Sequence, residues 1–279
     1  MHHWLRTALL LSIMTFPSAA KAQELAMGSC EVVARIHDRV VCRAEVEISD
    51  EAQDDVAQEY KANGIDPAVA LQQRRLDRLG TIIWDTALSH EFGDAISSTA
   101  QEVTDYNSAF KSKLDSNFAK DQRTLAEVNK HLENPDLTAP QKQSLLELKT
   151  ALETSITFYA QRAKQRESLP PEFFKMMADT EQEMAEGFLR QWNIAQHLYH
   201  KYGGRVVAVS GRYEPVEAYL KFLADIEAQP SLEIYSADYE DALRLLTANW
   251  QIVGETGQDV TKAEADEYFA SPLNQFSAQ

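Results

Sequence analysis

The stretch "HLYHKYGGRVVAVSGRYEP", residues 197–215, decides how the second half of the chain returns to the first. It begins in an apolar pattern with helical spacing, passes two glycines and continues into a β-branched run. Glycine readily adopts the left-handed conformation that ends a helix. We therefore predict that a long helix from Pro171 ends at Tyr202, that Gly203 or Gly204 caps it, and that a buried strand follows. The stretch is interpreted as a structural junction.

Two histidines one helical turn apart, His197 and His200, raise the alternative of a metal site. On a helical wheel of about 100° per residue, Tyr199 and Tyr202 share the apolar face with Trp192, whereas both histidines point away from it. A closed metal site needs a third and a fourth ligand, and the neighbouring positions carry only amides and a lysine. We favour solvated histidines and expect neither a metal nor another cofactor.

The segments around this junction predict mostly helix. "EVVARIHDRVVCRAEVEI", residues 31–48, reads as a β-hairpin that turns at His37-Asp38-Arg39. Asp66-Pro67 predicts a capped helix start, and that helix should end near Gly93. Residues 94–132 contain neither proline nor glycine, and a second amphipathic helix follows Thr138.

The expected fold class is α+β and predominantly helical, with a small sheet, packed helices and a projecting long antiparallel helical hairpin. We divide the chain into a signal peptide (1–22), a composite α+β body (23–93 and 170–253), the hairpin arm (94–169) and a polar, partly mobile tail (254–279).

The N-terminus has the pattern of a secretory signal: a basic start, an apolar segment from Ala8 to Phe16, and small residues that predict cleavage after Ala22. A lipid anchor at Cys30 is the rival, which the preceding residues fit poorly. No later run reaches the roughly 18 apolar residues of a membrane span, so we expect no membrane insertion and a periplasmic or secreted protein.

Cys30 and Cys42 are the only cysteines. An even count in an exported chain favours a structural disulfide, and the alternatives are two unpaired thiols or, less favoured, a redox pair. The net charge of −16 repels nucleic acid and anionic lipid, so we expect no nucleic-acid partner.

Catalytic signatures are absent from the sequence. His90-Glu91 lacks the second histidine of a zinc-protease motif, because Asp94 occupies that position. "VSGRYEP" lacks the glycine pattern of a nucleophile elbow. We expect no catalytic residue and favour a protein without turnover. A peptidyl-prolyl isomerase-related or metal-dependent enzyme stays open, as does a scaffold subunit of an envelope assembly.

Aromatic residues concentrate in and near the predicted sheet and its flanking helices. Core packing explains most of them, but some could line a groove for an extended peptide. The candidates for peptide binding are Trp84, Trp192, Tyr199, Tyr202 and Tyr213.

Residues 30–93 resemble the start of SurA-type periplasmic chaperones and related parvulin-associated proteins. The resemblance rests on Val32–Ile36, the turn 37–39, Val40-Val41, Glu45-Val46, and later Leu79, Ile82, Ile83 and Leu88. It implies a chaperone module without the isomerase domain, since the middle of the chain is long helix instead. The implied partners are unfolded or extended exported polypeptides, with envelope proteins as a further class.

Overall fold

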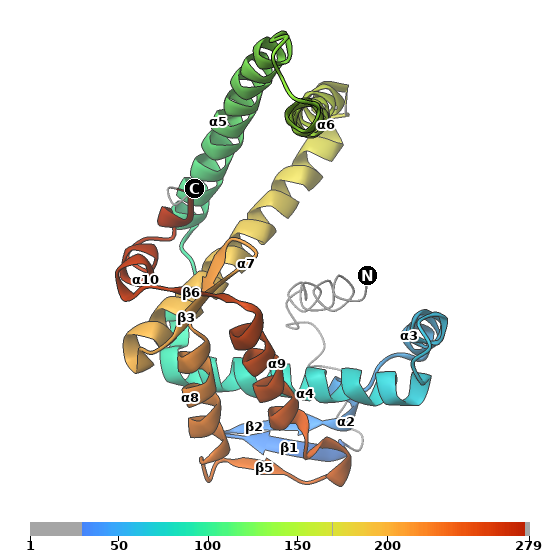
Figure 1. Cartoon of the computed structure of the whole chain (residues 1–279). Helices are drawn as coiled ribbons and strands as arrows, with labels where there is room; N and C mark the ends of the chain where they lie inside the picture. The colour runs from blue at the N-terminus through green and yellow to red at the C-terminus, as the bar shows by residue number, and fades with distance from the viewer. Residues whose placement is uncertain (1–29, 169, 277–279) are drawn as a thin grey trace. The chain divides into compact units, whose positions relative to one another are not determined.

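A computed structural model describes residues 30–168 and 170–276 of the chain (Figure 1). The expected signal peptide, residues 1–22, lies outside these ranges. Within them the protein is predominantly helical and has two small three-stranded antiparallel sheets, which confirms the α+β class.

The N-terminal hairpin forms as predicted. β1 (Val32–Ile36) pairs with β2 (Arg39–Cys42), and His37 takes a left-handed φ of 50° at the turn. β5 (Leu232–Ile234) adds to the other edge of β1, which gives the order β2-β1-β5. Cys30 and Cys42 are bonded, with Cα atoms 5.4 Å apart, so the predicted disulfide is confirmed.

Helices occupy most of the following chain. The elements up to the junction are α2 (Arg43–Val46), α3 (Asp50–Ala62), α4 (Pro67–Phe92), the 3-10 turn η2 (Gly93–Ile96), α5 (Ala100–Leu132), α6 (Ala139–Ser168) and α7 (Pro171–Tyr202). As predicted, the Asp66 carboxylate caps α4 by accepting from the Ala68 amide at 2.9 Å. The long helix expected from Asp94 begins later, because Thr99 and Glu102 form a capping box that starts α5.

The junction at the end of α7 is confirmed and extended. Gly203 and Gly204 both have positive φ, 58° and 95°, and the Gly203 amide donates to the Tyr199 carbonyl at 2.7 Å. β3 (Val206–Val209) follows, and a strand that the sequence did not reveal, β4 (Arg212–Glu214), folds back on it.

The remaining elements return the chain to both sheets. They are α8 (Val216–Glu227), β5, η3 (Ala237–Tyr239), α9 (Ala242–Thr256), β6 (Gln258–Val260), α10 (Lys262–Tyr268) and η4 (Asn274–Phe276). The segment expected to be a polar tail from residue 254 thus contains ordered elements. β6 pairs with β3, and Phe269 is fully buried, which explains why the segment is structured.

Contacts within the chain divide it into two units. The first comprises residues through Ser97 together with Arg190–Ser271, and the second comprises Ser98–Leu189 with the residues from Pro272 onward. The boundary lies inside α7, so the first half of this helix belongs with α5 and α6.

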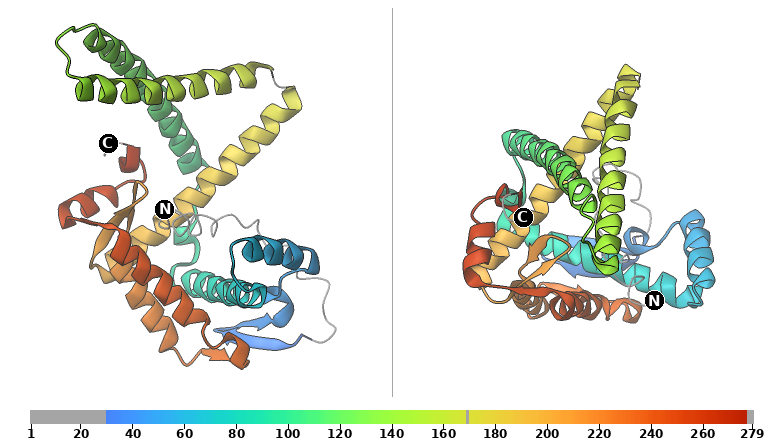
Figure 2. Two further views of the ribbon diagram at one scale, coloured as in Figure 1. Left: turned by 45° about the vertical axis from the view of Figure 1, so that its right-hand side comes forward. Right: turned by 45° about the horizontal axis from the view of Figure 1, so that its top comes forward.

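The first unit holds the main core. Its two sheets are packed by α4, α8, α9 and the last turns of α7 (Figure 2). Tyr239 and Phe269 are among its fully buried side chains.

In the second unit, α5 and α6 form the predicted helical hairpin. The Ser155 hydroxyl donates to Asp121 at 2.8 Å, and the rings of Phe118 and Tyr159 lie 6.0 Å apart, which fixes an antiparallel register. Val128 and Leu152 are buried along the hairpin.

Candidate functional site

The five aromatic residues expected to bind peptide lie in or against the core of the first unit. Trp192 and Tyr199 are only 8% and 7% exposed. Trp84 packs edge-on against Phe222 at 5.3 Å, Tyr202 packs on the same ring at 6.3 Å, and Tyr213 stacks on a neighbouring tyrosine at 4.6 Å. These are the contacts of packing residues. A role for them in peptide binding stays a prediction that their burial does not favour.

The hydroxyl groups of two of these tyrosines are paired within the chain. Tyr199 donates to Asp266 at 2.7 Å, and Tyr202 donates to Asp225 at 2.6 Å. Burial, and then the hydrogen bond to the Asp266 carboxylate, raise the pKa of Tyr199 to about 12. Both tyrosines therefore keep their protons at neutral pH and act as donors that hold helices together.

The two histidines of the junction do not form a site. His197 Nε2 lies 3.1 Å from the Ala95 carbonyl oxygen, and its ring stacks on Phe92 at 5.3 Å, so this side chain is half-buried rather than solvated as expected. His200 is exposed. Within the described part of the chain, no three histidine, cysteine, aspartate or glutamate side chains gather as a metal site requires.

An open groove between α4 and α9 is the candidate that the structure offers instead. The two helices approach closely at Gly80, where an added Cβ would lie 3.3 Å from the Ala242 carbonyl oxygen. A side chain at this position would force the neighbouring backbone to shift by a few tenths of an ångström, so glycine is suited to this close approach. Next to this crossing the helices leave a hollow of about 490 Å³.

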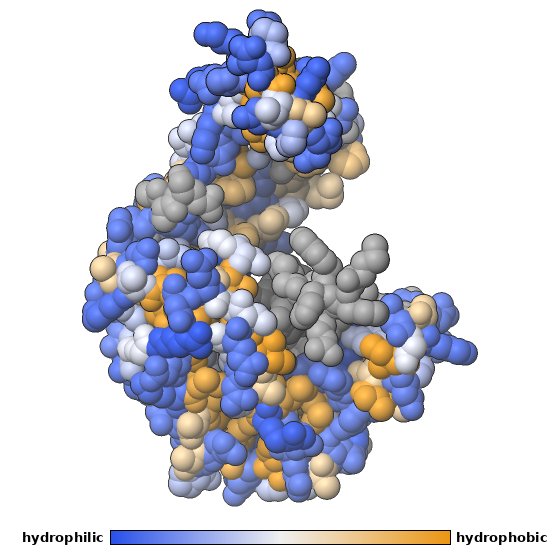
Figure 3. All heavy atoms as spheres, viewed as in Figure 1, coloured by the Kyte–Doolittle hydropathy of each residue, from blue (hydrophilic) through white to orange (hydrophobic). Residues whose placement is uncertain are grey.

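The groove is lined mainly by apolar and amide groups. Its walls are Ala68, Val69, Gln72, Gln73 and Leu76 from α4, and Asp241, Arg244, Leu245 and Ala248 from α9. Val69 is 59% exposed, which is high for a valine in a folded protein. Apolar residues also gather over α9 in Figure 3, framed by hydrophilic ones.

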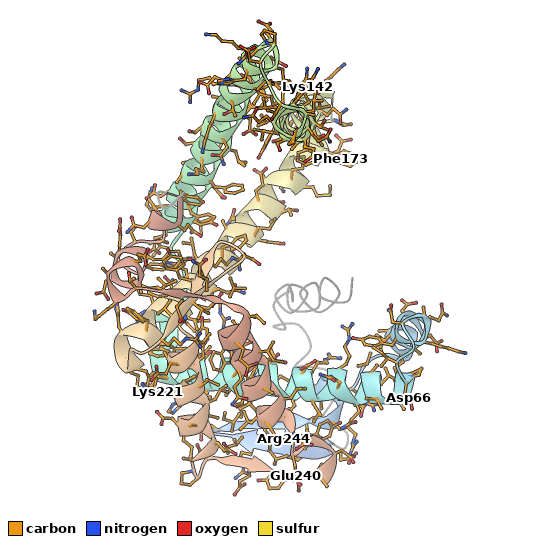
Figure 4. All side chains as sticks on the ribbon, in the orientation of Figure 1. Asp66, Lys142, Phe173, Lys221, Glu240 and Arg244 are labelled. Atoms are coloured by element: carbon orange, nitrogen blue, oxygen red, sulfur yellow. A yellow bond between two sulfur atoms is a disulfide. The ribbon has the colours of Figure 1, made fainter. Side chains whose placement is uncertain are left out.

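One ion pair stands at the rim of the groove. Arg244 contacts Asp241 through two nitrogen–oxygen contacts, of 2.9 and 2.8 Å, and Figure 4 labels Arg244 in the first turn of α9. The hydrogen bond from Arg244 lowers the pKa of Asp241, so this carboxylate stays ionised at neutral pH. The rim thus presents both charges close together above an apolar floor.

The chemistry of this groove is that of recognition. Its polar lining consists of the amides of Gln72 and Gln73 and one internally satisfied ion pair, so neither a nucleophile nor a proton-transfer pair faces the hollow. The Gln72 amide already donates to the Asp238 backbone carbonyl, so its side-chain oxygen is the group that it can offer to a ligand. Amide side chains can donate to and accept from a peptide backbone. Sequence reasoning missed this site because Val69 and Leu76 have the spacing of core residues on α4. Only the crossing of α4 and α9 reveals that their outer edge is uncovered.

Comparisons of the chain with protein-family models, with curated proteins and with solved structures found no match. None of the helices in residues 30–168 and 170–276 is long and apolar enough to cross a membrane.

Proposed function

We propose that the protein is a chaperone-like binding protein that holds non-native or extended polypeptide without chemical turnover. The observation that carries this proposal is the open groove between α4 and α9, with its apolar floor, its two amides and its paired rim charges. Non-native chains expose apolar side chains together with unpaired backbone groups, and the groove offers partners for both.

The size of the groove fits transient holding. A hollow of about 490 Å³ accommodates a few side chains rather than a folded domain. Burial of apolar area contributes roughly 25 cal/mol per Å², and ordering a flexible client opposes it. The expected affinity is therefore modest, which allows a client to be released without an energy source.

Two features support a location of the protein outside the reducing cytosol. The Cys30–Cys42 disulfide is of the kind that persists in oxidising compartments. The resemblance of residues 30–93 to SurA-type chaperones points in the same direction. We propose a periplasmic or secreted location, with exported polypeptides as clients.

An aggregation assay with matched variants tests the proposal. A chemically denatured client is diluted into buffer with equimolar protein, and light scattering is followed. The wild-type chain should suppress scattering, and Val69→Asp should lose most of this effect because it places a charge on the groove floor. Ile252→Asp is the control, because Ile252 is 48% exposed on α9 but does not line the groove. Equal scattering with and without wild-type protein would rule the function out. Equal suppression by both variants would place the binding site elsewhere.

A further inference from the structure

The first half of α7, in the second unit, exposes a row of large flexible apolar side chains. Phe173 is 43% exposed, Met176 is 56% exposed and Met184 is 55% exposed. Met177 lies between them and is half-buried. We call Phe173, Met176, Met177 and Met184 the α7 apolar face. Figure 4 marks Phe173 near the start of the helix.

These four side chains share one side of the helix. At about 100° per residue, the three methionines fall within about 60° of Phe173. Later in the same half, Ala185 and Leu189 are buried with Val103 and Tyr106 of α5. On the same wheel, Ala185 and Leu189 lie about 120° and 160° from Phe173, so the helix packs on α5 with a different side and leaves the α7 apolar face uncovered.

Carboxylates flank the α7 apolar face. Residues 171–189 contain five acids and one base, Lys175. Asp179 and Glu183 lie on one flank of the face, together with Glu172 and Glu186. Among the described residues, no ion pair engages Glu172, Asp179 or Glu183. The face thus combines an apolar stripe with a strip of negative charge.

We propose that the α7 apolar face binds cationic amphipathic segments of polypeptide. Apolar residues of the segment would contact the phenylalanine and the methionines, and lysine or arginine would lie beside Asp179 and Glu183. Methionine side chains are flexible and polarisable, so they adapt to different sequences. An amphipathic partner that lays its apolar side on such a stripe is a recurrent mode of peptide recognition.

Charge decides between this partner and two others. A second copy of the chain, with net charge −16, would bring carboxylates against carboxylates. An anionic lipid surface would meet the same repulsion. A cationic segment gains from both the apolar contact and the charge. The α7 apolar face indicates which class of client the protein would hold, and to that extent this proposal rests on the proposed holding function. It does not depend on the α4–α9 groove.

Fluorescence anisotropy with the full chain tests the proposal. The probe is a labelled peptide of about 18 residues that contains only leucine and lysine at helical amphipathic spacing. The comparison peptides are a scramble of the same composition and a leucine–glutamate counterpart. We expect the leucine–lysine peptide to bind at least tenfold more tightly than either. Its affinity should decrease as the NaCl concentration is raised from 50 to 500 mM, because salt screens the attraction between the lysines and the carboxylates.

Variants locate the binding. The triple variant Phe173→Gln, Met176→Gln, Met184→Gln should weaken binding at least tenfold, whereas Ile252→Gln should leave it unchanged. Asp179→Asn with Glu183→Gln should weaken binding about threefold and flatten the salt dependence. Because all these side chains are exposed, thermal unfolding should match the wild type, which separates lost binding from lost folding.

Several results would overturn the proposal. These are wild-type affinity in the triple variant, equal binding of the leucine–glutamate peptide, or tight binding to phosphatidylglycerol vesicles that the triple variant abolishes. A concentration-dependent dimer that only the triple variant disrupts would show instead that the face serves self-association. Two variants separate this proposal from that of the α4–α9 groove. If Val69→Asp abolishes aggregation suppression but binds the peptide normally, the groove holds the client and the proposal for the α7 apolar face is unaffected. If the triple variant loses peptide binding but still suppresses aggregation, the proposal for the groove is unaffected.

Discussion

The two halves of α7 differ in whether their large apolar side chains are buried or exposed. The half after residue 190 buries Trp192 and Tyr199, whereas the half before it exposes Met176 and Met184. Both halves are amphipathic, so the pattern along the helix does not separate them. The difference is whether another part of the chain covers the apolar side. Aromatic content alone is therefore a poor guide to a binding surface in this protein.

The cover over the second half comes from the C-terminal segment. Phe269, which follows α10, packs 4.8 Å from the ring of Tyr199 and 6.5 Å from that of Trp192. The Gln196 side chain donates to the Phe269 carbonyl at 2.7 Å. A segment that reads as a polar tail thus closes the surface on which the sequence placed peptide binding.

The largest expected effect comes from removing this cover. Phe269→Ala should destabilise the protein by about 3–5 kcal/mol, since it leaves a cavity beside Tyr199 and Trp192. Met184→Ala, on the exposed half, should change stability by less than about 0.5 kcal/mol. Urea unfolding monitored by circular dichroism measures both. A loss below 1 kcal/mol for Phe269→Ala would mean that the two halves do not differ in the way their burial indicates.

The second effect concerns the two units that share α7. Replacing Cys30 and Cys42 together by serine should cost about 3 kcal/mol, because the bond closes a short loop in the unfolded chain. Amide exchange should accelerate in the first unit, which contains both cysteines, and stay unchanged at residues 100–132 of the second. Exchange that accelerates equally in both units would show that they unfold together.

Local signals allowed much of the fold to be predicted. Asp66-Pro67 and Gly203-Gly204 mark a helix start and a helix end through backbone chemistry, and the β-branched runs around His37 mark a hairpin. The elements that were missed depend on distant partners. β4 and β6 have three residues each and exist because β3 lies between them. Such short strands carry too little periodicity to be recognised alone.

The α4–α9 groove could not be predicted from the sequence for a related reason. Val69 and Leu245 are more than 170 residues apart in the chain, and their shared groove depends on the close approach of α4 and α9 at Gly80. A single glycine in a helix predicts close packing but not the partner. Methionine side chains suit adaptable binding surfaces, but only the structure distinguishes the exposed first half of α7 from its buried second half.

A smaller effect should follow from one hydroxyl on the buried half. Tyr199→Phe removes the hydrogen bond to Asp266 and should cost about 1 kcal/mol, because Asp266 is exposed and keeps its contact with Lys262. Absorbance titration at 295 nm should show one tyrosine with a pKa of about 12 that this variant lacks. Since the folded pKa is raised, the stabilisation is complete below pH 10 and is lost as pH rises toward 12. A titration without such a component would contradict the buried position of this half.

The smallest expected effect contrasts two histidine environments in the first unit. His37, at the hairpin turn, stacks on His90 of α4 with ring centroids 3.7 Å apart, whereas His200 at the end of α7 is exposed. Burial, and then the nearby His90, lower the pKa of His37, although Asp38 opposes them. A lowered folded pKa means that the unfolded chain binds the proton more tightly, so stability should decrease as pH falls below 6.5. Urea midpoints measured between pH 5 and 8 should fall on the acidic side. His90→Gln should reduce that fall because it removes the like charge, and His200→Gln should leave it unchanged. An equal response in both variants would mean that the stacked pair does not couple stability to pH.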